Sequence, residues 1–225
     1  MKPKVGLITI GQSPRPDIIN EMKKVLGKRP EIIEAGALDG LSKEEVLSLI
    51  SSSGPSEQGY LVTRLQDGTV VTIPKEHIVK RIGAVLPKLE SQQVRTAAIL
   101  CVGDFPEYPF DGILLRPGKL IMQLVSSFHQ KGKGVVVIPL EEERYNAITR
   151  WNLSHVDAKI KVLLSGSDSE TIERLSEEIK EEDPAFVILE CMGYGENIKR
   201  SLKKRVNCPV ILPKKLLGCT LKEML

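Results

Sequence analysis

The chain has 225 residues, of which 41% are hydrophobic and 27% charged, with a formal net charge of +3 at pH 7. This composition is ordinary for a globular protein, and the small net charge argues against the basic stripe of a nucleic-acid-binding protein. No apolar segment approaches the roughly eighteen residues of a membrane-spanning helix, and the N-terminus lacks a signal-peptide cleavage site. We therefore expect a cytoplasmic protein that binds neither nucleic acid nor membrane.

The cysteines and histidines are not spaced like metal ligands. Cys101, Cys191, Cys208 and Cys219 form no C-x-x-C pair, and the three histidines are scattered along the chain. We therefore expect no metal site. The glycine-rich segments also lack both common nucleotide-phosphate fingerprints, so a nucleotide cofactor is not expected.

Short apolar runs alternate with helical patterns along the whole chain. Strands are expected at 5–10, 31–35, 96–101, 135–139, 159–164, 186–191 and 209–212, and helices at 17–26, 42–50, 75–93, 118–130, 140–153, 169–182, 196–205 and 214–225. This alternation predicts an α/β fold with mostly parallel sheets and right-handed crossovers. Two β-branched runs around Asp67-Gly68 predict a β-hairpin insertion near 60–73.

The order of elements predicts two Rossmann-like three-layer halves in a pseudo-two-fold relation. The first half is expected to combine residues 1–115 with 210–225, and the second to span 116–209, with a ligand cleft between them. Each half has a first strand followed by a loop, and a later strand that ends in a cysteine.

The stretch AFVILECMGYGEN, residues 185–197, places a cysteine at the end of a buried strand. Open α/β sheets bind ligands at this edge, where backbone N–H groups and helix dipoles favour a thiolate on Cys191. Cys101 ends an earlier strand in the same way. Two such thiols permit two-base chemistry, in which one thiolate removes a proton from carbon and the other thiol delivers one from the far face. The same pair can instead act as a nucleophile and an acid, as the cis–trans isomerisation of an unsaturated diacid would need. The alternative is that both cysteines are inert buried residues.

Polar donors cluster in the loop after the first strand. Arg15 can clamp a carboxylate or phosphate there, with Gln12 and Ser13 as further donors. The alternative is a solvated arginine in a turn.

Several residues around the second cysteine have two open interpretations. Tyr194 can donate its hydroxyl to a ligand or pack in the core. Glu141 and Glu142 can meet a substrate or simply begin a helix. Glu190 points to the opposite face of the strand from Cys191, so we expect it to pair with a buried cation or anchor a loop.

Three motifs resemble the AroM protein family over essentially the whole chain: ITIGQSPRPD, LCVGDFP and LECMGYG. That family is similar to the aspartate/glutamate/hydantoin racemase superfamily, which has two Rossmann-like halves, one cysteine from each half, and no organic cofactor or metal. The resemblance implies catalytic thiols at Cys101 and Cys191, and a substrate-carboxylate loop at Gly11, Gln12 and Ser13.

The chain departs from the racemase pattern after both cysteines. Val102 and Gly103 stand in place of a polar Cys-Asn-Thr-type turn, and Met192 and Gly193 replace a threonine that binds the carboxylate. The resemblance therefore implies a different substrate or an absence of racemase chemistry.

These observations lead to two expected functions. The first is a cofactor-independent racemase or isomerase of a small carboxylate, with Gly103, Met192, Gly193 and Tyr194 beside the two thiols. The alternative is a non-catalytic small-anion or metabolite-binding protein on the same scaffold. The hairpin near 60–73 also allows a homodimer contact.

Overall fold

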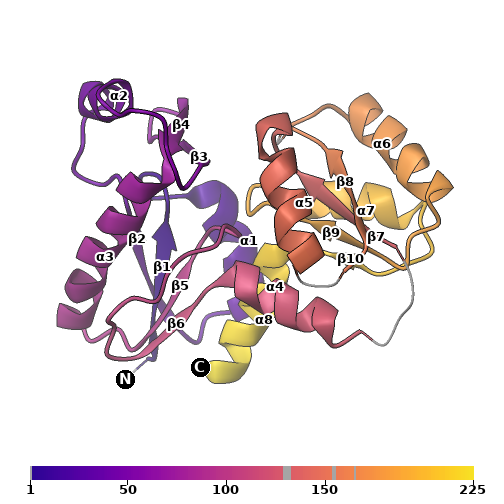
Figure 1. Cartoon of the computed structure of the whole chain (residues 1–225). Coiled ribbons are helices and arrows are strands. Elements are labelled where there is room, and N and C mark those ends of the chain that lie inside the picture. The colour runs from indigo at the N-terminus through magenta and orange to yellow at the C-terminus, as the bar shows by residue number, and fades with distance from the viewer. Residues whose placement is uncertain (1, 129–132, 154–155, 165) are drawn as a thin grey trace. The chain divides into compact units, whose positions relative to one another are not determined.

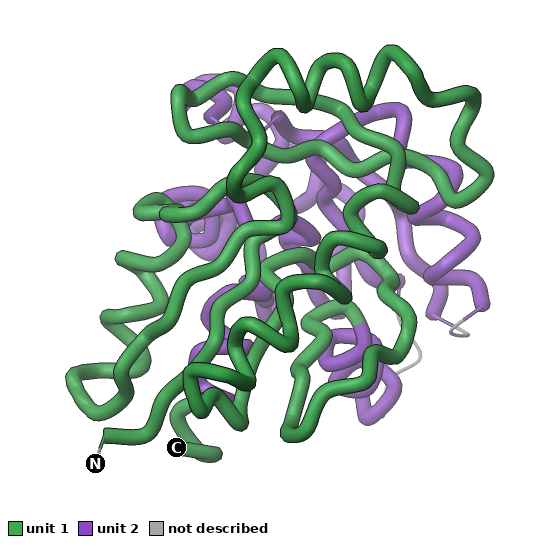
Figure 2. Tube along the Cα trace, turned by 90° about the vertical axis from the view of Figure 1, so that its left-hand side faces the viewer, with its two compact units in different colours: residues 1–118, 222–225 green, residues 119–221 purple. Residues whose placement is uncertain are grey.

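The computed structural model describes residues 2–128, 133–153, 156–164 and 166–225, which form two four-stranded parallel sheets and one antiparallel hairpin (Figure 1). The chain divides into two compact units, residues 1–118 with 222–225, and residues 119–221 (Figure 2). The predicted α/β fold with mostly parallel sheets and a hairpin insertion is confirmed.

The first sheet has the strand order β2-β1-β5-β6, and all its pairings are parallel. Its strands are β1 (Lys4–Thr9), β2 (Glu31–Gly36), β5 (Thr96–Ile99) and β6 (Ile113–Leu115). The sequence analysis missed β6, because three partly exposed residues are too few to show an alternating pattern.

Helices cover both faces of the first sheet. Helices α3 (Lys75–Ser91) and α1 (Pro16–Leu26) lie on opposite sides of it (Figure 1). Ile78 and Ile82 of α3 share one buried cluster with Ile8 of β1, which matches the predicted helical spacing. Helix α2 (Lys43–Ser51) begins with the predicted capping box, in which the Ser42 side chain accepts from the backbone N–H of Glu45.

The hairpin of β3 (Tyr60–Arg64) and β4 (Val70–Pro74) is antiparallel and turns at Asp67 and Gly68. Gly68 has a φ of 87°, a conformation that favours glycine. Hydrogen bonds from Thr69, and then from Lys43, lower the pKa of Asp67 to about 2. The hairpin reaches the loop after β1, because Gln12 N donates to the Arg64 carbonyl at 3.4 Å.

The second sheet repeats the strand order of the first. Its strands are β7 (Gly134–Ile138), β8 (Ala158–Val162), β9 (Phe186–Leu189) and β10 (Val210–Ile211). Read as β8-β7-β9-β10, the order matches β2-β1-β5-β6, and every pairing is parallel. The two strands that precede Cys101 and Cys191 therefore hold equivalent places in their sheets. Residues 210–211 pair with β9, whereas the sequence analysis grouped 210–225 with the first half.

Helices also cover both faces of the second sheet. Helices α6 (Ser169–Glu181) and α7 (Glu196–Lys203) share a buried cluster with β7 and β9. Helix α5 (Arg144–Leu153) lies on the other side (Figure 1), and the predicted helix over 140–153 begins instead with a 3-10 turn at Glu141–Glu143.

Two further helices lie within the described residues, α4 (Pro117–Ser126) and α8 (Pro213–Met224). The predicted end of the helix over 118–130 reaches residues 129 and 130, which lie outside the described residues. Among the helices that the structure describes, none combines the length and apolar character needed to cross a bilayer.

Candidate functional site

A short turn at the end of β5 holds Cys101. Leu100 N donates to the Ile8 carbonyl at 2.7 Å, which extends the strand pairing to the residue before the cysteine. Gly103 N then donates to Cys101 Sγ at 3.4 Å. Gly118 packs against this turn so closely that a Cβ on it would lie 2.4 Å from the Val102 carbonyl oxygen. The turn therefore has a defined backbone around a partly buried thiol.

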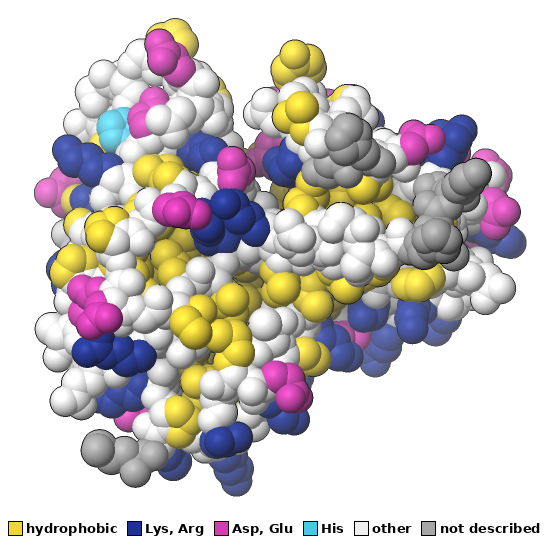
Figure 3. All heavy atoms as spheres, turned by 60° about the horizontal axis from the view of Figure 1, so that its bottom comes forward, with side chains coloured by type: hydrophobic (Ala, Val, Ile, Leu, Met, Phe, Trp, Pro, Cys, Tyr) yellow, Lys and Arg dark blue, Asp and Glu magenta, His cyan; other side chains and the backbone are white. Residues whose placement is uncertain are grey.

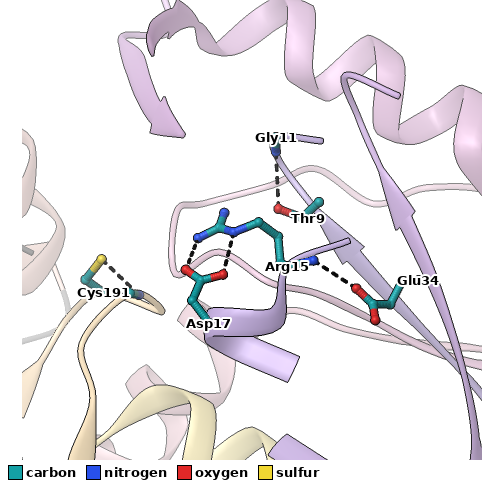
Figure 4. A network of polar contacts seen from close by, with 7 residues as sticks. Thr9, Gly11, Arg15, Asp17, Glu34 and Cys191 are labelled. Atoms are coloured by element: carbon teal, nitrogen blue, oxygen red, sulfur yellow. Dashed lines mark hydrogen bonds and ion pairs between the residues drawn. The ribbon is translucent and has the colours of Figure 1, made fainter. Parts of the chain in front are cut away.

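The turn after β9 holds Cys191 in the same manner. Gly193 N donates to Cys191 Sγ at 3.3 Å, and Figure 4 shows this contact at the cysteine. Tyr194 N donates to the Cys191 carbonyl at 3.3 Å and closes the turn. Burial raises the pKa of the Cys191 thiol, and the Gly193 N–H opposes this shift. The sequence analysis expected the backbone and dipole to dominate, whereas desolvation is the larger effect.

Two ionisable residues that the sequence analysis did not select are electrostatic neighbours of Cys191. The charge of Glu143 raises the pKa of the Cys191 thiol, and the charge of Lys214 lowers it. Burial raises the pKa of Glu143 itself, although Arg150 opposes this effect. Lys214 is buried, with 2% of its surface exposed, at the start of α8.

The run Glu141 to Glu143 shows why one acidic residue was overlooked. Glu141 and Glu142 are exposed, and Glu141 pairs with Arg144, whereas Glu143 is partly buried. A 3-10 turn gives successive side chains different directions, and the sequence alone does not tell which of three glutamates points inward. For Lys214, the available signal was a lysine just after a strand end, the edge that binds ligands in such sheets.

Glu190 forms a buried network on the opposite face of β9 from Cys191. Its carboxylate accepts from Trp151 Nε1 at 3.1 Å and pairs with Arg150 at 2.8 Å. Only 3% of the Glu190 side chain is exposed. The expectation that Glu190 pairs with a cation is confirmed, although Arg150 is partly exposed, at 28%, and is not the buried cation that was expected. The network ties α5 to the strand that presents Cys191.

Carboxylates hold the loop after β1. Ser13 donates its backbone N–H to Asp39 Oδ1 at 2.7 Å and its hydroxyl to Oδ2 at 2.6 Å. Gln12 donates to the Leu41 carbonyl at 2.7 Å and accepts from Gln66 N at 2.9 Å. These side chains, predicted as ligand donors, therefore have partners within the first unit.

Arg15 is also engaged, as Figure 4 shows. Its guanidinium makes a bidentate contact with the Asp17 carboxylate, from Nε to Oδ1 at 2.9 Å and from Nη2 to Oδ2 at 2.7 Å. Its backbone N–H donates to Glu34 Oε2 at 2.9 Å. Burial opposes ionisation of Asp17, yet the hydrogen bond and charge of Arg15 lower the pKa of that carboxyl. A ligand carboxylate would have to compete with Asp17 for this arginine.

Glycine is required at the start of this loop. A Cβ on Gly11 would lie 2.4 Å from both the Arg64 carbonyl oxygen and Thr63 Oγ1, so the hairpin approaches the loop at backbone distance. Gly11 N donates to Thr9 Oγ1 at 3.3 Å.

Two residues predicted beside Cys191 are buried. Tyr194 has no exposed surface, its hydroxyl donates to the Leu163 carbonyl, and burial raises its pKa. Met192 has 4% of its surface exposed. The Tyr194 hydroxyl therefore pins the turn to the end of β8.

Charges of both signs are spread over the face that Figure 3 shows, where acidic and basic side chains are interspersed with apolar ones. Within the described residues, no group of three or more His, Cys, Asp or Glu side chains is placed to hold a metal ion.

The two parallel sheets have matching strand orders, and a cysteine follows the equivalent strand in each, β5 in the first sheet and β9 in the second. This is an α/β fold of the aspartate/glutamate racemase type. An aspartate racemase from Picrophilus torridus superimposes with a TM-score of 0.60 at 14% identity, covering 99% of this chain and 94% of that one. Unliganded arylmalonate decarboxylase superimposes with a TM-score of 0.62 at 11% identity, covering 100% of this chain and 92% of that one. Glutamate racemase from Francisella tularensis in complex with D-glutamate superimposes with a TM-score of 0.55 at 14% identity, covering 99% of this chain and 80% of that one.

The chain belongs to the AroM family, whose model, described as AroM protein, matches residues 5–225. Among curated proteins, none matches the chain in sequence. The family assignment agrees with the motif resemblance. The structural likeness, at such low identity, establishes the fold and leaves the reaction open.

Proposed function

We propose that this protein is a cofactor-independent racemase or isomerase of a small carboxylate, with Cys191 and Cys101 as its acid/base pair. The observation that carries the proposal is the equivalence of the two thiols. Each follows the strand beside the first strand of its sheet, and each accepts an N–H from the glycine two residues later. That equivalence suits a reaction that treats two faces of one carbon alike.

The proposed reaction begins with one cysteine as thiolate and the other as thiol. The thiolate takes the proton from the carbon beside the carboxylate, and the electron pair of the broken C–H bond moves into the carboxylate group. The pair then returns to carbon as the other thiol gives its proton to the opposite face. The two cysteines end with exchanged protonation states. This step requires both sulfur atoms to reach the same carbon.

Glu143 and Lys214 have complementary parts in the proposal. Lys214 stabilises the thiolate form of Cys191 by its charge, whereas ionised Glu143 destabilises it. Because burial raises the pKa of Glu143, its carboxyl holds a proton more readily than an ordinary glutamate does. Glu143 is thus suited to exchange the proton of Cys191 with solvent between turnovers.

Arg15 is the proposed partner of the substrate carboxylate. It is the cation of the loop after β1, and its planar fork matches a carboxylate. Asp17 occupies the fork, so substrate binding would replace this internal pair. An Asp17→Asn variant should therefore bind carboxylates more tightly.

A non-catalytic small-anion or metabolite-binding protein is the second candidate. The observation that favours it is the burial of Cys191, which raises its pKa and favours the unreactive thiol. Under this alternative, ligands bind but no carbon–hydrogen bond is broken.

Deuterium wash-in distinguishes the two candidates. A panel of amino, hydroxy and dicarboxylic acids is incubated with protein in heavy water, and exchange at the α-carbon is followed by NMR. The proposal expects exchange with the wild type, and its loss in Cys191→Ala and Cys101→Ala. Cys208→Ala is the matched control, since Cys208 is a partly buried thiol two residues before β10, and it should retain exchange. Binding without exchange across the panel would support the second candidate.

A further inference from the structure

The turns after β5 and β9 share a Cys-X-Gly pattern whose backbone serves the sulfur atom. In both turns the middle residue is apolar, Val102 in one and Met192 in the other. The N–H of the glycine donates to Sγ at 3.4 Å in the first turn and 3.3 Å in the second. The same contact occurs in both units at equivalent strand ends, so it is a feature of the pattern.

A backbone N–H donates more strongly to a thiolate than to a thiol, because a hydrogen bond to a charged acceptor is stronger than one to a neutral acceptor. The contact therefore favours the ionised sulfur, and it acts against the burial that favours the neutral one. Fixed backbone donors need no reorganisation when charge develops at the acceptor.

We propose that Gly103 and Gly193 are positioning residues whose backbone N–H groups stabilise the thiolate form of Cys101 and of Cys191 when each acts as the base, and so offset part of the burial that favours the thiol. The inference deepens the proposed function and rests on it for its catalytic meaning. The hydrogen bonds themselves can be tested without any substrate.

An NMR titration of the intact wild-type protein tests the proposal directly. With glycine labelled by ¹⁵N, the amide proton signals of Gly103 and Gly193 are followed from pH 6 to pH 11, because burial raises the pKa of the Cys191 thiol. We expect each to move downfield with an inflection that vanishes in the matching cysteine variant, Cys101→Ser or Cys191→Ser. Amide signals that stay flat while the thiols titrate would overturn the proposal.

Paired glycine variants provide a second test. Gly103→Ala retains the N–H, and its Cβ would meet only side-chain atoms at 3.5 Å, whereas Gly103→Pro removes the N–H. Iodoacetamide labelling is measured for each cysteine by peptide mass spectrometry, with Cys208 and Cys219 as internal references. We expect about tenfold slower labelling of Cys101 in the proline variant than in the alanine variant. This is the fall in thiolate fraction that a rise of about one unit in the pKa of the thiol produces. Equal rates in the proline and alanine variants would refute the role of the N–H.

The outcomes separate this inference from the proposed function. Amide inflections together with no deuterium exchange would support thiolate stabilisation by the glycine N–H groups and would reject the proposed racemase or isomerase activity. Exchange that depends on both cysteines, without amide inflections, would support the reaction and reject the turns. The NMR titration uses the wild-type backbone, so it decides the matter even if Gly103→Pro does not fold.

Discussion

Replacing Glu190 by alanine should destabilise the second unit strongly. The carboxylate is 3% exposed and holds two donors at once, Trp151 Nε1 at 3.1 Å and Arg150 at 2.8 Å. The change removes an ion pair and leaves the indole N–H of a fully buried tryptophan without its acceptor.

The size of the effect follows from two opposing contributions. Removing one partner of a buried ion pair costs about 3–5 kcal/mol. Arg150 is 28% exposed, so water can restore part of its solvation, which places the expected loss near the lower value of about 3 kcal/mol. For a chain of this size, each kcal/mol lowers the melting temperature by about 2–4 °C, so we expect a fall of about 6–12 °C.

Urea unfolding of Glu190→Ala, followed by tryptophan fluorescence, measures this loss at the single tryptophan, Trp151. Glu190→Gln keeps an acceptor for the indole but loses the charge, so it should fall between the wild type and the alanine variant. Glu178→Ala is the matched control, because Glu178 is 48% exposed and lies 3.6 Å from Lys161. Its effect should stay within about 0.5 kcal/mol. A loss below 1 kcal/mol for Glu190→Ala would show that desolvation cancels the network and would refute the reasoning.

Three further predictions concern the first unit. Ser42→Ala removes the cap of α2 and should lower the free energy of unfolding by about 1 kcal/mol, whereas Ser42→Asp should preserve it. Asp67 has a pKa of about 2 in the folded state, so its contribution to stability is complete above its unfolded pKa of about 3.9 and is lost as the pH falls toward 2. Unfolding of Asp67→Asn measured between pH 2 and pH 6 should lack this component, and an unchanged pH profile would contradict it. Gly118→Ala should destabilise the protein by moving the Val102 carbonyl, while Gly103→Ala should be tolerated, and similar melting temperatures for the two would count against the close packing.

The inner strands β1, β5, β7 and β9 were predictable because they are buried on both faces and therefore appear as continuous apolar runs. Val135 to Ile138, for example, are all almost fully buried in β7. The capping box at Ser42 and the Asp67-Gly68 turn are local patterns whose partners are three residues or fewer away. Their structures follow from short-range hydrogen bonds alone.

The candidate site was predictable only in part, because its hydrogen-bond partners come from distant segments. The sequence identified Gln12, Ser13 and Arg15 as donors, but Ser13 bonds to Asp39, 26 residues away, and Arg15 bonds through its backbone to Glu34. A donor-rich loop has the same composition whether it awaits a ligand or is already satisfied. Only the fold distinguishes the two cases.

The thiols illustrate a second limit. The position of Cys191 at a strand end followed from the apolar run before it, but its protonation depends on how far the surrounding structure removes water. Desolvation proved larger than the N–H groups of the turn. Burial of a polar atom depends on every neighbouring segment, so local sequence gives little guide to it.

The strands of the two sheets occupy separate segments of the chain, and this affects how the protein folds while it is being synthesised. All strands of the first sheet lie between Lys4 and Leu115, and all strands of the second lie between Gly134 and Ile211. Neither sheet waits for a strand from the other segment. The first sheet can therefore close its hydrogen bonds while the ribosome is still translating the second. Early closure shortens the time for which unpaired strand edges of the nascent chain are open to aggregation.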